Sequence, residues 1–402
     1  MTQHSQPTRL YHYINTLMPE THGHQRKAFG DFVAALLVVR TCCQATVART
    51  FANFEAASRR LTRWLHNPRV EPQAQARAPA QVVVAQLPLR GIVRIALDWT
   101  TEDQQHLLVA SLVVGRRAVP LYWEAYTTGE LKGQQRALEH AFVRQVVEQE
   151  LSHVDRERLL LTADRGFCQG ALLALLARLQ VPFVVRLPAH VTVCLHPQWQ
   201  KLGSLPLTGT TRRRALGHLW CLRSNPQRCW VVQARARNKK GRWEYWHLVS
   251  TRPRSAVTMA QEDARRFGCA EGFRDAKREL GFAQARSAEI EPWARMFALV
   301  AAALLLLTQL GTHLLRHPQR QSWLRQVRSR RRARSELSVL IVVCHLLDQA
   351  TSLWDRLNPH ATLTWRPLYK CVQTSAARAL RDQAVLHRRL GGVQTPSCSH
   401  SP

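Results

Sequence analysis

Two short apolar runs, each ending on an aspartate, constrain most strongly what this chain can fold into. The run 91–97 ends on Asp98, and the run 158–163 ends on Asp164. Both runs are dense in aliphatic residues without strict alternation, which is typical of strands in a sheet covered on both faces. An ionised carboxylate at the mouth of such a sheet is costly unless it is paired or binds a metal. The plainer alternative is that each aspartate caps a strand-to-helix turn, where Asp is common.

The elements expected after residue 90 follow the order of an α/β fold. Three strands with short connections, as in an antiparallel meander, precede a helix, a strand, a helix and a fifth strand. This is the order of a ribonuclease-H-like mixed sheet flanked by helices. In that fold the first and fourth strands are neighbours, so we expect Asp98 and Asp164 to meet. The expected strands are 92–98, 106–114, 118–126, 159–164 and 183–187, and the expected helices are 134–151 and 170–179.

The charge balance points to a nucleic-acid partner. The 402 residues include 57 Lys and Arg against 27 Asp and Glu, which gives a formal net charge of +30. Arginine supplies most of this charge, and its planar fork binds two phosphate oxygens at once. A basic excess of this size is the electrostatic footprint of a protein that binds DNA or RNA. The alternative is a merely basic protein or a codon bias toward arginine, but codon bias does not explain the shortage of acids.

One apolar segment is long enough to cross a bilayer. Residues 296–315 contain no Asp, Glu, Lys or Arg, but polar residues from Thr308 to His313 break the second half. We therefore expect a buried core helix and no membrane partner. The ten cysteines include no Cys-x-x-Cys pair, and the polar N-terminus lacks a signal-peptide pattern. Reduced thiols in a cytoplasmic protein are the simplest interpretation.

Regions of different composition precede and interrupt this core. Residues 1–85 are expected to be helical, with helices at 24–43 and 45–66, and we interpret them as a helical N-terminal domain that contacts DNA. An all-helical packing module without a DNA role is the alternative. Residues 190–255 predict a β-rich insertion, because short alternating runs rich in Trp and Val are separated by turn signals. The core would then comprise residues 86–189 and 256–315.

The C-terminal region, 316–402, is expected to be basic and helical, with a disordered tail from residue 373. Its arginine-dense stretch, 316–334, includes Arg330, Arg331 and Arg332. This stretch either contacts phosphates or forms a solvated helix face.

The best candidate for a third acidic residue is Glu271. On a helix, Glu271 lies one turn before Arg274, and Arg274 and Lys277 share one face. An acid with cations beside it suits a site that holds metal ions and a scissile phosphate. The alternative is an ordinary surface helix with ion pairs three residues apart.

Three motifs together resemble those of the DDE transposases of bacterial insertion sequences. The branch is the one with a tyrosine–arginine–glutamate–lysine helix and a core split by a β-insertion, and the resemblance covers about residues 40–315. The motifs are Leu97-Asp98-Trp99-Thr100, Thr162-Ala163-Asp164-Arg165-Gly166-Phe167 and Glu271-Gly272-Phe273-Arg274-Asp275-Ala276-Lys277.

The resemblance implies metal-dependent DNA strand cleavage and strand transfer at the ends of an insertion sequence. It implies that Asp98, Asp164 and Glu271 are catalytic and hold Mg²⁺ or Mn²⁺. Arg266, Arg274 and Lys277 would contact the DNA phosphates. The implied partner is double-stranded DNA, both transposon ends and target, bound by a homodimer at the nucleoid in the cytoplasm. A tryptophan of the insertion, Trp220, Trp230, Trp243 or Trp246, either stacks on a flipped base or packs in the core.

The chain departs from this family at two positions of the helix. Members commonly carry two consecutive glutamates, of which the first usually binds metal, but here Ala270 precedes Glu271. The motif tyrosine is also missing, and Asp263 stands near its place. Consecutive helix residues point about 100° apart, so positions 270 and 271 cannot reach the metals equally. Three functions stay open: an active transposase, a transposase-derived DNA-binding protein without catalysis, and another metal-dependent nuclease of this fold.

Overall fold

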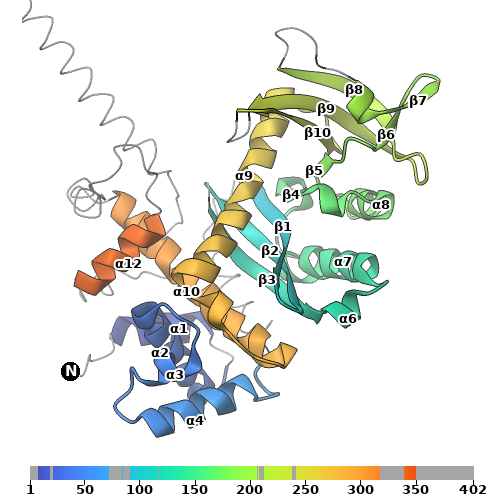
Figure 1. The fold of residues 1–402 in the computed structure, drawn as a ribbon. Helices are drawn as coiled ribbons and strands as arrows, with labels where there is room; N and C mark the ends of the chain where they lie inside the picture. Colours follow the sequence, from blue (N-terminus) through green and yellow to red (C-terminus); the bar gives the residue numbers. More distant parts are fainter. Residues whose placement is uncertain are drawn as a thin grey trace, which may run out of the picture.

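The protein is an α/β protein built on one ten-stranded mixed sheet flanked by helices (Figure 1). The computed structural model describes residues 8–18, 21–71, 84, 91–115, 117–205, 207, 212–237, 241–316 and 339–349. The strands are β1 (Val93–Glu102), β2 (Gln105–Val114), β3 (Arg117–Thr127), β4 (Leu159–Ala163), β5 (Phe183–Leu187), β6 (Thr192–Leu195), β7 (Gln198–Lys201), β8 (Arg213–Cys221), β9 (Gln227–Arg237) and β10 (Trp243–Ser250). Their order across the sheet is β3-β2-β1-β4-β5-β10-β9-β8-β6-β7.

The first five strands pair as the sequence predicts. β1, β2 and β3 form an antiparallel meander, and β4 and β5 run parallel to β1. One boundary differs from the prediction, because β1 does not end at Asp98. Its pairing with β2 continues to Glu102 opposite Gln105, whereas its parallel pairing with β4 stops at Leu97 opposite Ala163. Asp98 therefore lies inside a strand, but at the end of the parallel ladder.

The strands of the expected insertion extend the same sheet. β10 pairs with β5 in antiparallel fashion, and β9, β8, β6 and β7 follow. Three of these five strands were expected from the alternating runs. β6 and β7 were not, because each has only four residues and carries too short a pattern to be recognised.

The helices cover both faces of the sheet, which explains the nearly continuous apolar strands. In Figure 1, α7 and α8 lie on one face and α9 crosses the other. Polar contacts from β1 agree with this arrangement of the helices. Arg94 of β1 pairs with Glu262 of α9, and Trp99 of β1 donates a hydrogen bond to Glu139 of α7. The helices are α1 (Thr8–Leu17), α2 (Gly23–Val39), α3 (Gln44–Ala48), α4 (Phe54–Leu65), α6 (Thr128–Leu131), α7 (Gln135–Arg144), α8 (Gly170–Arg178), α9 (Ala256–Arg274), α10 (Ile290–Arg316) and α12 (Val339–Gln349).

The expected helix 45–66 is two helices, so that prediction was wrong. α3 ends at Ala48, and α4 begins after Asn53, whose side chain accepts a hydrogen bond from the Ala56 N–H at 2.9 Å. Asn is a strong N-cap because this bond satisfies one of the free amides of the first turn. The second helix ends at Leu65, shortly before Asn67-Pro68, as expected.

The apolar segment is a core helix, as expected. α10 is the one helix in the described ranges that is long and apolar enough to cross a membrane, and 94% of its apolar 18-residue segment is buried. Its side chains Trp293 and Phe297 pack with Phe282. The N-terminal helices gather beside α10 in Figure 1. The arginines Arg330, Arg331 and Arg332 and the tail from residue 373 lie outside the described residues.

Candidate active site

Asp98 and Asp164 lie side by side at one end of the parallel part of the sheet. Each follows directly on the last parallel pair of β1 and β4, which is Leu97 opposite Ala163. The two residues therefore come next in register on neighbouring parallel strands, and the charge of Asp164 adds to the rise that burial causes in the pKa of Asp98. The two aspartates therefore meet, as the strand order predicts. Their roles as catalytic and metal-binding residues stay predictions.

The environment of Asp98 disfavours its charge. Burial raises the pKa of Asp98 from 3.8 to about 6; the Arg266 guanidinium opposes this rise, and the charge of Asp164 adds to it. The Arg266 Nη1 lies 3.9 Å from Asp98 Oδ2, and the Trp99 N–H donates to Asp98 Oδ1 at 3.0 Å. Only 18% of the Asp98 side chain is exposed. A divalent cation between the two carboxylates would offset the cost of keeping both ionised.

Asp164 is oriented by the turn that follows β4. It caps the single 3₁₀ turn Arg165–Phe167, and its Oδ1 accepts a hydrogen bond from the Gly166 N–H at 2.7 Å. A Cβ on Gly166 would stand 3.0 Å from that oxygen, so any larger residue would press on the carboxylate. The plainer interpretation of Asp164 as a turn cap is therefore correct locally. Capping does not, however, explain why a second, half-buried aspartate lies beside it.

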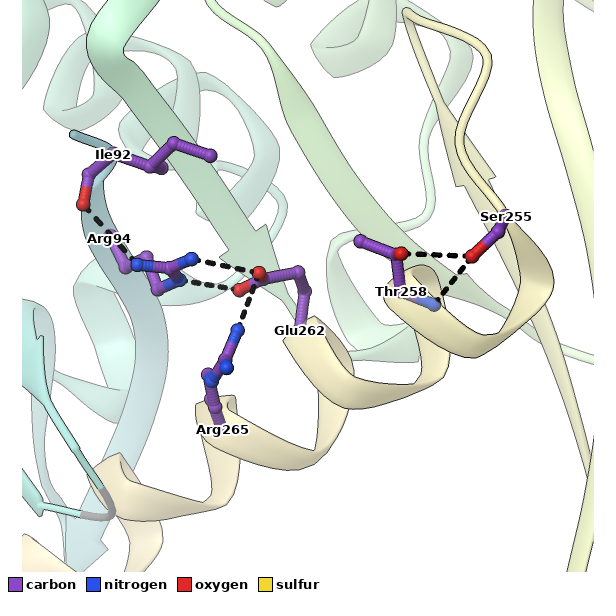
Figure 2. Close-up of polar contacts among 6 residues, drawn as sticks. All are labelled: Ile92, Arg94, Ser255, Thr258, Glu262 and Arg265. Atoms are coloured by element: carbon purple, nitrogen blue, oxygen red, sulfur yellow. Dashed lines mark hydrogen bonds and ion pairs between the residues drawn. The ribbon is translucent and has the colours of Figure 1, made fainter.

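The start of α9 is anchored to the sheet by a buried ion pair (Figure 2). Glu262 accepts from Arg94 Nε at 2.6 Å and Nη2 at 2.9 Å, and from Arg265 Nη1 at 2.6 Å. Ser255 caps the helix by accepting from the Thr258 N–H at 3.0 Å. Because Arg94 and Asp98 lie on the same face of β1, this anchor sets which part of α9 lies over Asp98.

Arg266 is the residue of α9 that faces Asp98. It is buried, and its guanidinium also lies 3.7 Å from Asp263 Oδ1, one turn earlier on the helix. Asp263 in turn pairs with Arg186 of β5. The residue at the place of the missing motif tyrosine is therefore an acid held by two arginines. Arg266 also lies over the ring of Phe267, at 4.9 Å from its centroid.

The structure does not bring Glu271 to the two aspartates. Glu271 pairs with Arg274 on its own helix and with Arg117 of β3, whose Nη1 is 3.3 Å from Glu271 Oε2. At about 100° per residue, Glu271 points about 140° away from Arg266, whereas Ala270 points within about 40° of it. Ala270 is exposed on that side of α9. The α9 position one turn after Arg266, on the same side of the helix, therefore carries a methyl group instead of a carboxylate.

The two remaining cations of the third motif lie in different places. Lys277 Nζ donates to the Thr101 carbonyl at 2.8 Å and lies 2.7 Å from Glu102 Oε1, near the end of β1 that carries Asp98. Arg274 is engaged with Glu271. Of the three residues expected to contact DNA phosphates, Arg266 and Lys277 are thus held near the Asp98 end of β1, and Arg274 is paired with Glu271.

Sequence reasoning missed Arg186, which continues the row of the two aspartates. β4 and β5 pair up to Ala163 opposite Val185, so Arg186 follows Asp98 and Asp164 at the same level of the sheet. Its guanidinium lies 4.7 Å from the ring centroid of Trp246. A single arginine within an otherwise apolar strand was the signal that could have identified it.

Glu139 was also missed, and it holds the site from the opposite face of the sheet. Its carboxylate is buried and accepts hydrogen bonds from Trp99 Nε1 at 2.9 Å and Gln169 Nε2 at 2.7 Å. Trp99 follows Asp98, and Gln169 lies five residues after Asp164. Glu139 therefore ties together the two segments that carry the aspartates, and no pattern in the sequence indicated this role.

Metal-ligand chemistry at this site is limited to the two aspartates. Within the described ranges no group of three or more His, Cys, Asp or Glu side chains could hold a metal ion as it stands. Mg²⁺ is nevertheless commonly bound by one or two carboxylates, with water and substrate phosphate completing its shell. Asp98 and Asp164 fit that role if Arg266 gives up its contact with Asp98. No protein-family model matches this chain, and no curated protein matches it either.

Proposed function

We propose that this chain is a DNA transposase of the DDE type with a ribonuclease-H-like core. The sheet order β3-β2-β1-β4-β5, with a meander followed by two parallel strands, is the order expected of such a core and supports the proposal. The five strands between β5 and α9 fit the β-insertion of that branch. The net charge of +30 supports double-stranded DNA as the partner, and the resemblance implies a homodimer at the bacterial nucleoid.

The observation that carries this proposal is the pair of aspartates at one end of neighbouring parallel strands. Asp98 is kept in an environment that raises its pKa, which is typical of functional carboxylates. Bound Mg²⁺ or Mn²⁺ would supply an activated water or 3′-hydroxyl and stabilise the leaving oxygen. Asp98 and Asp164 would hold the ion, and Arg266 and Lys277 would neutralise charge on the scissile phosphate.

A second candidate function is a transposase-derived protein that binds DNA without cutting it. The position of Glu271 favours this candidate, because a third carboxylate at the metal would require α9 to turn or Glu271 to leave Arg117 and Arg274. Ala270 lies on the same side of α9 as Arg266, one turn later, and carries no carboxylate. A site with two carboxylates would bind metal more weakly than one with three.

A cleavage assay on linear DNA that carries the sequences flanking this gene separates the two candidates. An active transposase cuts in Mg²⁺, and Asp98→Asn and Asp164→Asn abolish cutting while DNA binding stays within a few-fold. A protein that has lost its ligand binds the same DNA but is inert, and Ala270→Glu restores Mg²⁺-dependent cutting. Failure of the wild type and of the Ala270→Glu variant to bind DNA would contradict both candidates.

A further inference from the structure

Helices α2, α3 and α4 pack on one another around a group of aromatic side chains that continues into the core of the molecule. Phe32 of α2 packs edge-on against Phe51, with centroids 5.9 Å apart, and against Trp64 of α4, at 6.4 Å. Trp64 also packs against Phe29, at 5.9 Å. Of the α4 side chains, Ala57, Leu61, Trp64 and Leu65 are buried. α4 is therefore held firmly by one side, and its other side is exposed at the edge of the molecule (Figure 1).

The exposed side of α4 is a polar stripe. Its members are spaced by three or four residues, so they share one face of the helix. A helix of 12 residues is about 18 Å long, which matches the scale of a DNA groove. The members of the stripe are Glu55, Arg59, Thr62, Arg63 and His66.

The charge around this stripe is strongly basic. The segment 49–69 contains five arginines and one acid, Glu55. Arg60 is used internally, since it pairs with Asp31 at 2.9 Å and lies over the rings of Phe32 and Phe51. Arg59 and Glu55 are 3.8 Å apart, but their side chains are 78% and 74% exposed. Such a pair is worth little, so Arg59 can exchange Glu55 for another anion at low cost.

We propose that α4 lies in the major groove of duplex DNA and provides this chain's sequence-dependent contacts. In DNA-binding proteins that have a helix, a turn and a second helix, the second helix enters the major groove. α3, the turn after it and α4 follow one another in this order. Arg59 and Arg63 would contact base edges, where arginine pairs with guanine, and Arg49 and Arg69 would contact phosphates beyond either end of α4. The stripe carries one ring, the imidazole of His66, and the exposed Phe54 begins the helix. Two isolated rings do not make the series of stacking side chains that single-stranded nucleic acid uses. Duplex DNA is therefore the partner that fits.

This inference rests on the proposed function only in that the chain binds DNA, and binding by the full-length protein tests it. The probe is a random-sequence duplex library, from which bound sequences are selected and then measured by fluorescence anisotropy. Arg59→Gln/Arg63→Gln should weaken binding to the selected duplex at least tenfold and remove its preference over random duplex. The matched control is Arg136→Gln/Arg144→Gln, which removes two exposed arginines from α7 and should change binding less than twofold.

Hydrogen exchange of the wild-type protein gives a second measurement that does not depend on a folded variant. Residues 54–66 should exchange more slowly when the selected duplex is added. Equal weakening by the α4 and α7 variants would mean that net charge alone matters and would overturn the proposal. Unchanged exchange in α4 despite tight duplex binding would overturn it as well, while leaving the proposed function intact. A chain that binds no duplex would contradict both.

Discussion

Replacing Asp98 with Asn should make the protein more stable at neutral pH. Burial raises the pKa of Asp98 from 3.8 to about 6, so an ionised Asp98 lowers the free energy of unfolding. At about 1.4 kcal/mol per pKa unit, this rise corresponds to about 3 kcal/mol at pH 7.5. Asn has the same shape and no charge, so Asp98→Asn removes the cost. Unfolding entropy is about 2.1 cal/mol/K per residue, so for 402 residues the expected rise in Tm is roughly 3–4 °C.

The sign of the effect depends on pH. The pKa of Asp98 is higher in the folded protein than in the unfolded chain. The Asp98 carboxyl group therefore contributes its full stability at low pH, where it is protonated in both the folded and the unfolded state. This contribution is lost as the pH rises through about 6. At pH 4 the Asp98 carboxyl group is only partly ionised in the unfolded chain, so the increase in the free energy of unfolding caused by Asp98→Asn should fall to about 0.5 kcal/mol. The advantage of the variant should therefore grow between pH 4 and pH 6 and level off above that.

The assay is urea unfolding of wild type and Asp98→Asn at pH 4, 5.5 and 7.5, with chelator present throughout. Asp98→Leu is a useful comparison, because it also removes the charge but replaces a polar side chain with a larger apolar one. If the Asn variant is less stable than wild type at pH 7.5, or if the stability difference is independent of pH, the explanation by burial is wrong. Such a result would mean that the attraction between Asp98 and Arg266 outweighs burial.

Three other variants probe the turn after β4, the anchor of α9 and the basic C-terminal stretch. Gly166→Ala should lower the affinity for Mn²⁺ several-fold with little change in Tm, because its Cβ would press on Asp164 Oδ1 in an exposed turn; an unchanged affinity would mean that the turn relaxes freely. Glu262→Gln should cost about 2–4 kcal/mol in urea unfolding, since it leaves Arg94 and Arg265 without their buried partner; the exposed control Glu55→Gln should cost less than about 0.5 kcal/mol. Changing Arg330, Arg331 and Arg332 to Gln should reduce the slope of log affinity against log salt by about one for each DNA phosphate that these arginines neutralise, and an unchanged slope would identify a solvated surface.

Much of the core could be predicted from the sequence because its strands are short, apolar and separated by turn signals. The meander, the neighbouring positions of β1 and β4 and the meeting of Asp98 and Asp164 all follow from element order. The end of β1 could not be predicted in this way, since Asp98 interrupts the apolar run while antiparallel pairing with β2 continues. β6 and β7 were missed because four residues carry no usable periodicity.

The candidate site was harder to predict because its contacts join distant segments. Sequence spacing placed Glu271 on a helix with Arg274, but only the packing of α9 on the sheet determines which side faces Asp98. Arg117, which holds Glu271, is 154 residues away in the chain. Arg186 and Glu139 each join the site as a single residue that belongs to no sequence motif. Local patterns specify elements, whereas the direction of each side chain depends on tertiary packing.

Whether Asp98 and Asp164 together form a metal site can be decided by Mn²⁺ binding to the full-length protein, followed by electron paramagnetic resonance. We expect a weak site that disappears in Asp98→Asn and in Asp164→Asn and is unchanged in Glu271→Gln. Ala270→Glu should tighten binding by about tenfold or more, because it adds a carboxylate on the side of α9 that carries Arg266. Loss of binding in Glu271→Gln, with no gain in Ala270→Glu, would contradict the assignment of the third position. Mn²⁺ binding that survives Asp98→Asn would contradict the metal site itself.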